Sequence, residues 1–373
     1  MSRDFLKGAS RIVVKIGSAI LTGPGGELEE GVFNSLASQI ARLKASGRAF
    51  AIVSSGAVAA GVRRLGLKDR PRTISEKQAA AAVGQSYLMW RYERAFGRYG
   101  QRVAQLLLTH EDLKDRRRYL NSRRTLATLL ALGVIPIVNE NDTVVVEEIM
   151  LGDNDNLSAM VATLMDAHLL IMLSDIDGLY KGDPRLDPHA QLIPLVSEID
   201  PSLEGMAGGA GSPTGVGGMR TKLQAARGAT RAGIATVIAN GRARDVVPRI
   251  LSGEEIGTLF LPKGDPLSKR KHWIAFVLKP RGWVVVDEGA KEALVMKGKS
   301  LLPSGIVAIS GKFDIGDPIE VRDNKGRPLA RGLTNYASGE INKIKGVKSK
   351  DIEEVLGYKY EDEVIHRDDL VVI

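Results

Sequence analysis

The sequence contains no cysteine, only five histidines and no long apolar run. Without cysteine the chain can form neither disulfides nor thiolate metal sites, and the histidines are scattered singly rather than clustered. A membrane-spanning helix needs roughly 18–20 apolar residues, so we predict none. The first residues, Met-Ser-Arg-Asp-Phe, lack the apolar segment of a signal peptide. We therefore expect a soluble cytoplasmic protein.

The sequence also lacks a strong local excess of one charge. The net charge is +8 over 373 residues, and residues 261–373 carry 20 Lys and Arg against 17 Asp and Glu, a net charge of +3. A dedicated nucleic-acid binder usually concentrates basic residues on one domain or face. The densest basic run, Arg116-Arg117-Arg118, lies on an expected helix and is interpreted as a solvated face.

The common nucleotide-binding motifs are missing as well. Gly298-Lys299-Ser300 resembles the end of a P-loop, but Ala293 stands where that motif requires its first glycine. After Gly215-Val216-Gly217, Arg220 occupies the position of the last glycine of a Rossmann fingerprint. No protein-kinase catalytic loop is present. Phosphate chemistry in this chain would need a different arrangement.

The apolar pattern predicts strands that alternate with helices up to about residue 260. Strands are expected at residues 11–16, 49–54, 103–109, 134–138, 168–174 and 234–239. Helices are expected at residues 116–132, 155–167 and 219–232, and a long Ala-rich helical region ends near residue 99. This alternation predicts an α/β fold, with a mostly parallel sheet covered by helices on both faces.

The composition changes beyond residue 260. Prolines, glycines and the basic run Lys269-Arg270-Lys271 predict an exposed linker over residues 261–277. Short strands separated by glycine turns follow and predict a small β-rich domain. We therefore expect two domains, at residues 1–260 and 278–366.

Polar residues stand at the carboxyl ends of four predicted strands. They are Lys15 with Gly17 and Ser18, then Ser54 and Ser55, then Asn139 to Asp142, and finally Ser174 and Asp175. Open α/β sheets bind their ligands beyond the carboxyl ends of the strands. We expect these side chains to gather at one edge of the sheet.

The stretch Gly152 to Ala159 places two carboxylates and two amides in four consecutive positions before an apolar helical run. One Asp or Asn is explained by capping the helix, because its side-chain oxygen accepts from a free N–H of the first turn. Four polar residues in a row exceed that need. A helix start attracts anions, so acidic side chains there suggest that they hold cationic groups or a magnesium-bound phosphate.

A glycine-rich segment, residues 205–218, precedes the expected helix that contains Lys222. It is either a flexible linker or a phosphate-binding loop with exposed N–H groups. Two lysines and a carboxylate around such turns suit phosphoryl transfer. An acceptor carboxylate, with a pKa of roughly 4, is ionised at neutral pH and needs no general base. Since no catalytic histidine is evident, the pattern favours formation of an acyl phosphate.

The ordered motifs resemble those of the glutamate 5-kinases, which belong to the amino-acid kinase family. The motifs are Val14 to Ser18, Ser54 to Ala57, Asn139 to Asp142, Gly152 to Asp155 and Gly217 to Lys222, and the tail resembles a PUA domain at Gly332 to Tyr336 and Glu363 to Asp368. The resemblance covers nearly the whole chain. It implies the amino-acid kinase fold, a three-layer αβα sandwich, followed by a small β-rich PUA domain.

The same resemblance implies a reaction and its partners. The reaction is the phosphorylation of L-glutamate by ATP with Mg²⁺, which gives L-glutamyl 5-phosphate in the first step of proline biosynthesis. Feedback inhibition by proline is implied too. We further expect a homo-oligomer without membrane association.

The resemblance also implies roles for individual residues. Lys15 and Lys222 would stabilise the transferring phosphoryl group, and Asp155 would orient both lysines. Glutamate would be bound by Ser55, Asp142 and Asn154. ATP would be bound by Lys15, Ser174, Asp175, Val216, Gly217, Gly218, Met219, Arg220, Thr221 and Lys222. Val216 departs from the family pattern, in which a small hydroxyl residue is expected.

Two alternatives stay open at this point. One is another amino-acid kinase, similar to N-acetylglutamate kinase. The other is an RNA-binding or RNA-modification protein that acts through the PUA-like tail, against which the weak local charge argues. Plainer roles also exist for single residues: Lys15 as a solvated lysine at a strand end, Asp142 as a turn cap, and Ser174 as a structural residue.

Overall fold

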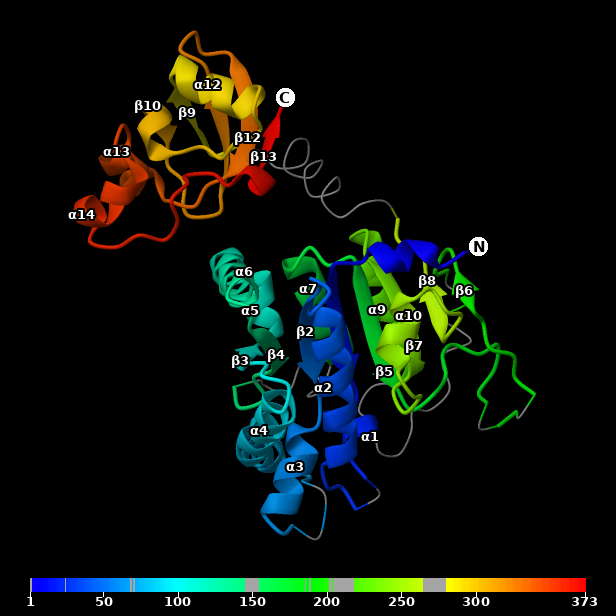
Figure 1. Cartoon of the computed structure of the whole chain (residues 1–373). Coiled ribbons are helices and arrows are strands. Elements are labelled where there is room, and N and C mark those ends of the chain that lie inside the picture. The colour runs from blue at the N-terminus through cyan, green and yellow to red at the C-terminus, as the bar shows by residue number, and fades with distance from the viewer. Residues whose placement is uncertain are drawn as a thin grey trace. The chain divides into compact units, whose positions relative to one another are not determined.

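The computed structural model describes residues 2–23, 25–67, 69, 71–144, 154–184, 186–187, 189–200, 203, 218–263 and 280–373. The chain divides into two compact units, Met1–Pro266 and Leu267–Ile373, which we call the larger and the smaller unit (Figure 1). Most of the predicted linker, residues 261–277, lies outside the described residues. The domain limits 1–260 and 278–366 stay predictions.

The larger unit is built on an eight-stranded sheet with the order β3-β4-β2-β1-β5-β7-β8-β6. Its strands are β1 (Arg11–Ile16), β2 (Ala49–Ser54), β3 (Val103–Leu108), β4 (Ile135–Glu140), β5 (Leu169–Ser174), β6 (Leu195–Val196), β7 (Ala235–Asn240) and β8 (Thr258–Phe260). The strands β1 to β5 and β7 run parallel, and β8 pairs antiparallel with β7. All residues of β4 and β5 are buried, as expected of parallel strands covered on both faces.

Helices form a layer on each face of this sheet. They are α1 (Ser18–Leu21), α2 (Glu30–Lys44), α3 (Ala57–Arg64), α4 (Ile74–Gly97), α5 (His110–Lys114), α6 (Arg116–Ala131), α7 (Asn154–Leu164), α9 (Met219–Arg231) and α10 (Val246–Leu251), with the short 3₁₀ helix η1 (Asp4–Gly8) near the N-terminus. The helices α2, α4 and α10 pack into one apolar core with one face of the strands, and α5, α6, α7 and α9 pack into a second core with the other face.

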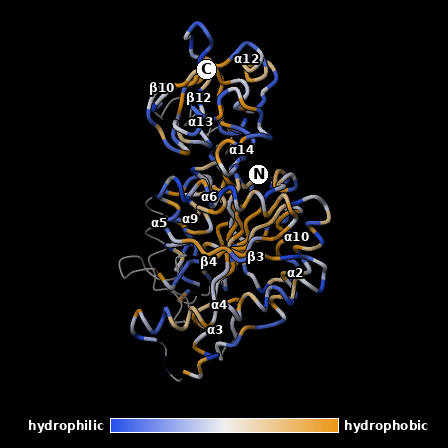
Figure 2. The backbone as a smooth tube through the Cα atoms, turned by 90° about the vertical axis from the view of Figure 1, so that its left-hand side faces the viewer, coloured by the Kyte–Doolittle hydropathy of each residue, from blue (hydrophilic) through white to orange (hydrophobic). Residues whose placement is uncertain are grey.

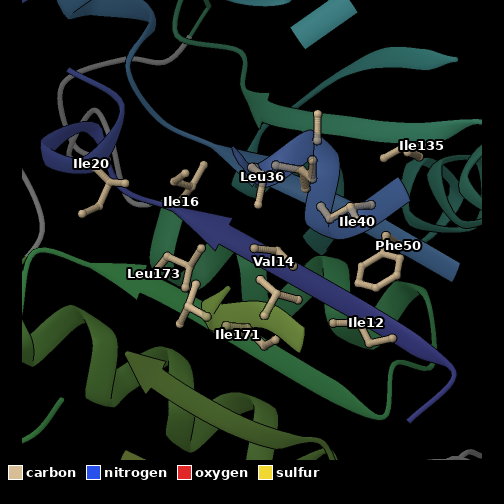
Figure 3. Close-up of a cluster of buried hydrophobic side chains, with 14 of the residues drawn as sticks. Ile12, Val14, Ile16, Ile20, Leu36, Ile40, Phe50, Ile135, Ile171 and Leu173 are labelled. Atoms are coloured by element: carbon tan, nitrogen blue, oxygen red, sulfur yellow. The ribbon is translucent and has the colours of Figure 1, made fainter. Parts of the chain in front are cut away.

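Strand β1 contributes to both cores because successive side chains of a strand point to opposite faces. Ile12, Val14 and Ile16 belong to the core on the α2 side, where they lie near Leu36 and Ile40 (Figure 3). Val13 belongs to the core on the side of α7 and α9. By the same alternation the side chain of residue 15 points towards α7 and α9.

The Ala-rich region predicted to be helical up to about residue 99 consists of two helices, α3 and α4. They cross so closely that a Cβ atom on Gly61 would lie 1.7 Å from the backbone oxygen of Ala80. A Cβ atom on Gly84 would lie 1.8 Å from the backbone oxygen of Ala57. Only glycine permits this approach at either position, and the crossing brings the middle of α4 next to the loop after β2.

The smaller unit has a separate five-stranded sheet with the order β10-β9-β11-β12-β13. Its elements are β9 (Gly282–Val286), α12 (Glu288–Val295), η3 (Pro303–Gly305), β10 (Ile306–Gly311), β11 (Pro318–Arg322), β12 (Pro328–Leu333), α13 (Ser338–Ile344), η4 (Ser349–Asp351), α14 (Ile352–Leu356), η5 (Arg367–Asp369) and β13 (Leu370–Val372). It has its own apolar core, which includes Val284, Val321 and Tyr336.

The predicted α/β class and the β-rich tail are confirmed by these two sheets. In Figure 2 the central strands of the larger unit are largely hydrophobic, whereas the surrounding helices alternate between hydrophilic and hydrophobic residues. Strand β4 ends two residues later than predicted, so Asn139 and Glu140 belong to the strand itself. Among the described residues, no helix is both long and apolar enough to cross a membrane.

Candidate active site

The carboxyl ends of the parallel strands meet at one edge of the sheet. Ile16 of β1 lies beside Ser54 of β2, and Ser174 of β5 lies beside Asn240 of β7. The backbone N–H of Ser55 donates to Ile16 O, which joins the loop after β2 to the end of β1. The polar residues that follow the strands therefore share one region of the larger unit.

Asp155 is the centre of the charged part of this region. It lies in the first turn of α7 with 2% exposure. Its Oδ1 is 2.6 Å from Lys15 Nζ, and its Oδ2 is 3.3 Å from Lys222 Nζ. Thr221 Oγ1, with one hydrogen to donate, lies 2.7 Å from the same Oδ2 and 2.9 Å from Gly218 O. One carboxylate thus holds two ammonium groups from β1 and α9.

The three charges of this cluster are buried, which makes their mutual interaction strong. Burial alone would raise the pKa of Asp155, but the adjacent Lys15 and Lys222 hold that pKa well below its usual range. Burial lowers the pKa of Lys222, and Asp155 opposes that effect. The cluster has two positive charges against one negative charge. It is therefore suited to receive a further anion.

The start of α9 adds backbone donors beside this cluster. Gly218 is the N-cap of α9 and, having no side chain, does not itself cap the first turn. Free N–H groups at a helix start are suited to phosphate oxygens. Met219 packs against the apolar core and Arg220 is exposed. The positions 216 and 217, also predicted to bind ATP, lie outside the described residues.

Ser174 and Asp175 lie at the end of β5, on the sheet between β1 and β7. Ser174 is buried, and its Oγ donates to Asp175 Oδ1 at 3.1 Å. The charge of Asp175 acts to raise the pKa of Lys222. The pair predicted to bind ATP is therefore electrostatically coupled to the lysine cluster.

Asn154 joins α7 to the loop after β2. Its Nδ2, which has two hydrogens to donate, lies within hydrogen-bond distance of Ser54 O (3.2 Å), Ser55 Oγ (3.1 Å) and Asn139 Oδ1 (3.0 Å). The structure thus brings together Ser55 and Asn154, two of the three residues predicted to bind glutamate. Asn154 directly precedes Asp155, so this amide cluster lies next to the lysine cluster.

Asp142, the third residue predicted to bind glutamate, follows β4 and is 9% exposed. Burial, assisted by the neighbouring charge of Glu140, raises the pKa of Asp142 to about 7. Glu140 Oε1 lies 3.6 Å from His110 Nδ1. No hydrogen bond among the described residues joins Asp142 to Ser55 or Asn154. Its placement in the same site rests on its position at the end of β4.

Two residues of this region were not assigned a role from the sequence. Asn139 and Gln85 are buried, and Asn139 Nδ2 donates to Gln85 Oε1 at 2.8 Å. Asn139 could have been found from its position at a strand end. Gln85 could not, because it lies in the middle of α4 and reaches the site only through the close crossing of α3 and α4.

The comparisons with known proteins agree with this architecture. The profile of the amino acid kinase family matches residues 10–240, and that of the PUA domain matches residues 282–356. A glutamate 5-kinase of Geobacter sp. (strain M21) is 54% identical over 373 residues, which is 100% of both chains. The glutamate 5-kinase of Caldanaerobacter subterraneus subsp. tengcongensis is 54% identical over 363 residues, 97% of this chain and 98% of the relative. That of Geobacter sulfurreducens is 53% identical over the full length of both.

The layered parallel sheet and the match over residues 10–240 define the class as a kinase of the amino acid kinase fold, here with a PUA domain after it. The likeness to relatives extends without a break through both parts of the chain. The chain therefore belongs to the glutamate 5-kinase family and is an enzyme.

Proposed function

We propose that this enzyme transfers the γ-phosphoryl group of ATP to the side-chain carboxylate of L-glutamate, with L-glutamyl 5-phosphate and ADP as products. The observation that carries the proposal is the buried carboxylate of Asp155 between Lys15 and Lys222. Two ammonium groups held in place at the carboxyl edge of the sheet can neutralise negative charge on a moving phosphoryl group. The names of the relatives support glutamate as the acceptor.

The reaction needs little proton chemistry from the protein. A carboxylate oxygen of glutamate, already ionised, forms a bond to the γ-phosphorus while the bond from that phosphorus to the bridging oxygen of ADP breaks. The attacking oxygen supplies the electron pair of the new bond, and the pair of the broken bond stays on the ADP oxygen as negative charge. No proton is transferred, so no general base is required. Lys15 and Lys222 stabilise the charge that spreads over the phosphoryl oxygens, and Asp155 keeps both lysines in position.

ATP would be held by the start of α9 and the end of β5. The N–H groups of the first turn of α9, after Gly218, and the ammonium of Lys222 would bind its phosphates, and Ser174 and Asp175 would contact the rest of the nucleotide. Both oxygens of Asp155 are engaged with lysines. We propose that Mg²⁺ is bound mainly through the ATP phosphates and water, as is usual for this ion.

Glutamate would be held by Ser55, Asp142 and Asn154. Asn154 Oδ1 is buried and has no partner among the described residues, so it can accept from the α-ammonium group. Ionised Asp142 would pair with the same group. The Ser55 hydroxyl can donate to a carboxylate. This arrangement would recognise a free amino acid.

The product would enter proline biosynthesis, and proline would inhibit the enzyme by competing for the site. Proline shares the α-ammonium group that Asn154 and Asp142 would bind and has a carboxylate to which Ser55 could donate. We further propose that the enzyme acts in the cytoplasm as a homo-oligomer. A glutamate saturation curve measured at several proline concentrations tests the inhibition, which would appear as a rise in KM at constant kcat.

The proposed reaction is tested by ADP release with four acceptors: glutamate, N-acetylglutamate, aspartate and uridylate. We expect rapid release with glutamate alone, and hydroxylamine should trap the product as a hydroxamate because an acyl phosphate reacts with amines. Equal or faster turnover with N-acetylglutamate would contradict the proposal, since an acetylated nitrogen cannot pair with Asp142.

We also propose that the smaller unit binds RNA. Trp283, Arg281, Arg322 and Arg331 line a cavity of about 430 Å³, and the Arg322 guanidinium lies 5.0 Å from the centre of the Trp283 ring. Aromatic rings and arginines together suit bases and phosphates. Binding to a short single-stranded RNA that weakens steeply with salt, and that Trp283→Ala reduces, would support this role. Absence of binding at low salt would exclude it.

A further inference from the structure

Three buried amide side chains form a chain of hydrogen bonds from α4 to α7. Asn139 Nδ2 donates to Gln85 Oε1 at 2.8 Å, and Asn154 Nδ2 donates to Asn139 Oδ1 at 3.0 Å. Each of the three residues is at most 9% exposed. Of the three, only Asn154 is expected to contact substrate, so the other two require an explanation.

Main-chain groups favour one direction for the hydrogen bonds between these three amides. The backbone N–H of Glu140 donates to Asn139 Oδ1 at 2.9 Å. A backbone N–H can only donate, so Asn139 must present its oxygen on that side and its Nδ2 towards Gln85. The carbonyl of Ser54 accepts from Asn154 Nδ2, and a carbonyl can only accept. The backbone therefore favours this orientation of both asparagine amides, and in this orientation Asn139 Nδ2 needs an acceptor of its own.

With the hydrogen bonds in this direction, one acceptor atom stays open for a ligand at the α7 end of the three amides. Asn154 directs its Nδ2 to three acceptors, and its Oδ1 is buried without a partner among the described residues. An unpaired buried polar atom costs stability, which is recovered when a ligand supplies a donor. The α-ammonium group of an amino acid is such a donor.

Gln85 is the residue at the other end that keeps the chain in this direction. Its Oε1 is the acceptor for Asn139 Nδ2, and without it that buried donor would lose its bond. Asn139 would then gain by turning towards another acceptor, which would withdraw its Oδ1 from Asn154. The close contact between α3 and α4 places Gln85 within reach of Asn139. Gly84, the residue before Gln85, lies against Ala57 at the start of α3.

We infer that Gln85 is a positioning residue for amino-acid recognition: through Asn139 it holds Asn154 with its Oδ1 free to accept from the α-ammonium group of the substrate. The inference rests on the proposed function and deepens it. It adds a cause for substrate selectivity. The three hydrogen-bonded amides favour substrates with a free ammonium group over analogues without one, such as glutarate. Gln85 itself need not touch the substrate.

The test compares Gln85→Met, which keeps the length but removes both polar atoms, with Gln85→Glu, which keeps an accepting oxygen for Asn139. We expect Gln85→Met to raise KM for glutamate roughly tenfold, the size of one lost buried hydrogen bond, with KM for ATP unchanged. Its preference for glutamate over glutarate, measured as the ratio of kcat/KM values, should fall by a similar factor. Gln85→Glu should bring both KM for glutamate and the preference for glutamate over glutarate most of the way back to the wild-type values. Gln105→Met, at an exposed position of β3, should match the wild type.

A double-mutant cycle completes the test. If Gln85 acts through Asn154, Gln85→Met should add little to the KM increase already caused by Asn154→Ala. Additive losses, or a Gln85→Glu enzyme as impaired as Gln85→Met, would overturn the inference and indicate direct contact between Gln85 Nε2 and the substrate. An unchanged KM in Gln85→Met would overturn it as well. A wild type inactive on glutamate would instead refute the proposed function, and the inference with it.

Discussion

Lys15 and Asp155 form an ion pair that is almost completely buried, with Nζ 2.6 Å from Oδ1 and side-chain exposures of 7% and 2%. The pair joins the end of β1 to the first turn of α7. Buried ion pairs are costly to desolvate and contribute little net stability by themselves. A charge cluster retained at such a cost at the carboxyl edge of a parallel sheet is best explained by its proposed role in phosphoryl transfer.

Replacing either lysine of this cluster by methionine should lower kcat much more than it raises KM. If Lys15 and Lys222 neutralise charge that develops in the transition state, each loss should cost roughly 10²–10³ in kcat. Initial rates of ADP release at varied ATP and glutamate measure both constants. Lys7→Met, at an exposed lysine of η1, is the control and should behave as the wild type. A selective rise in KM would indicate a role in binding only.

Asp155→Asn should reduce both turnover and stability in the absence of nucleotide. Asparagine keeps the shape of the side chain in the first turn of α7, but it leaves Lys15 and Lys222 facing each other without a counter-charge. Breaking a buried pair in this way costs about 3–5 kcal/mol. Thermal unfolding measures the loss, and ATP should raise the Tm of this variant more than that of the wild type, because its phosphates replace the missing negative charge. Equal shifts would contradict this account.

The lysine cluster was foreseeable because its parts are local sequence features. Lys15 ends an apolar strand, Asp155 begins an apolar helix, and Lys222 follows a glycine-rich segment. Parallel strands place their carboxyl ends together, so the residues could be expected at one edge. Because side chains alternate between the two faces of the sheet along β1, the sequence also predicts on which face Lys15 lies.

The amide chain was not foreseeable for a physical reason. Gln85 lies in an Ala-rich helix whose pattern predicts only helix, and its contact with Asn139 depends on the crossing of α3 and α4. That crossing depends in turn on Gly61 and Gly84, which from sequence alone are simply unfavourable residues in a helix. The raised pKa of Asp142 likewise follows from burial, which no local pattern reports.

Gly84→Ala should disturb this crossing and the site together. The added methyl would lie 1.8 Å from Ala57 O, so the helices must separate. We expect a loss of roughly 1–3 kcal/mol or more in the free energy of unfolding and a higher KM for glutamate, since Gln85 moves with the helix. Gly97→Ala, at the last residue of the same helix with no atom within 4 Å, is the matched control. It should be neutral or slightly stabilising.

A chain that ends after Lys263 should fold and keep kinase activity. Its last residues remain anchored, because the N–H of Leu261 donates to Val196 O and that of Lys263 to Thr230 O. The larger unit has its own two cores and the whole charge cluster. Circular dichroism, thermal unfolding and ADP release test the prediction. A soluble, cooperatively unfolding fragment without activity would show that the smaller unit completes the site.

The raised pKa of Asp142 predicts that glutamate binding weakens in acid. As pH falls through about 7 the carboxyl is protonated and can no longer pair with the α-ammonium group, so KM for glutamate should rise. KM in Asp142→Asn should be high and nearly independent of pH from 6 to 8. A wild-type KM that is flat over the same range would refute the role of Asp142, with KM for ATP as the internal control.

The same shift predicts how the stability difference between Asp142→Asn and the wild type depends on pH. The carboxyl has a pKa of about 7 in the folded protein and of roughly 4 in the unfolded chain. Ionisation of Asp142 therefore lowers the free energy of unfolding. This destabilisation is complete above pH 7 and absent below roughly pH 4. The asparagine variant should have the higher Tm at pH 8, and this advantage should shrink as pH falls towards 5. Thermal unfolding of both proteins across this range measures it, and an advantage that grows in acid would contradict the burial of an ionised Asp142.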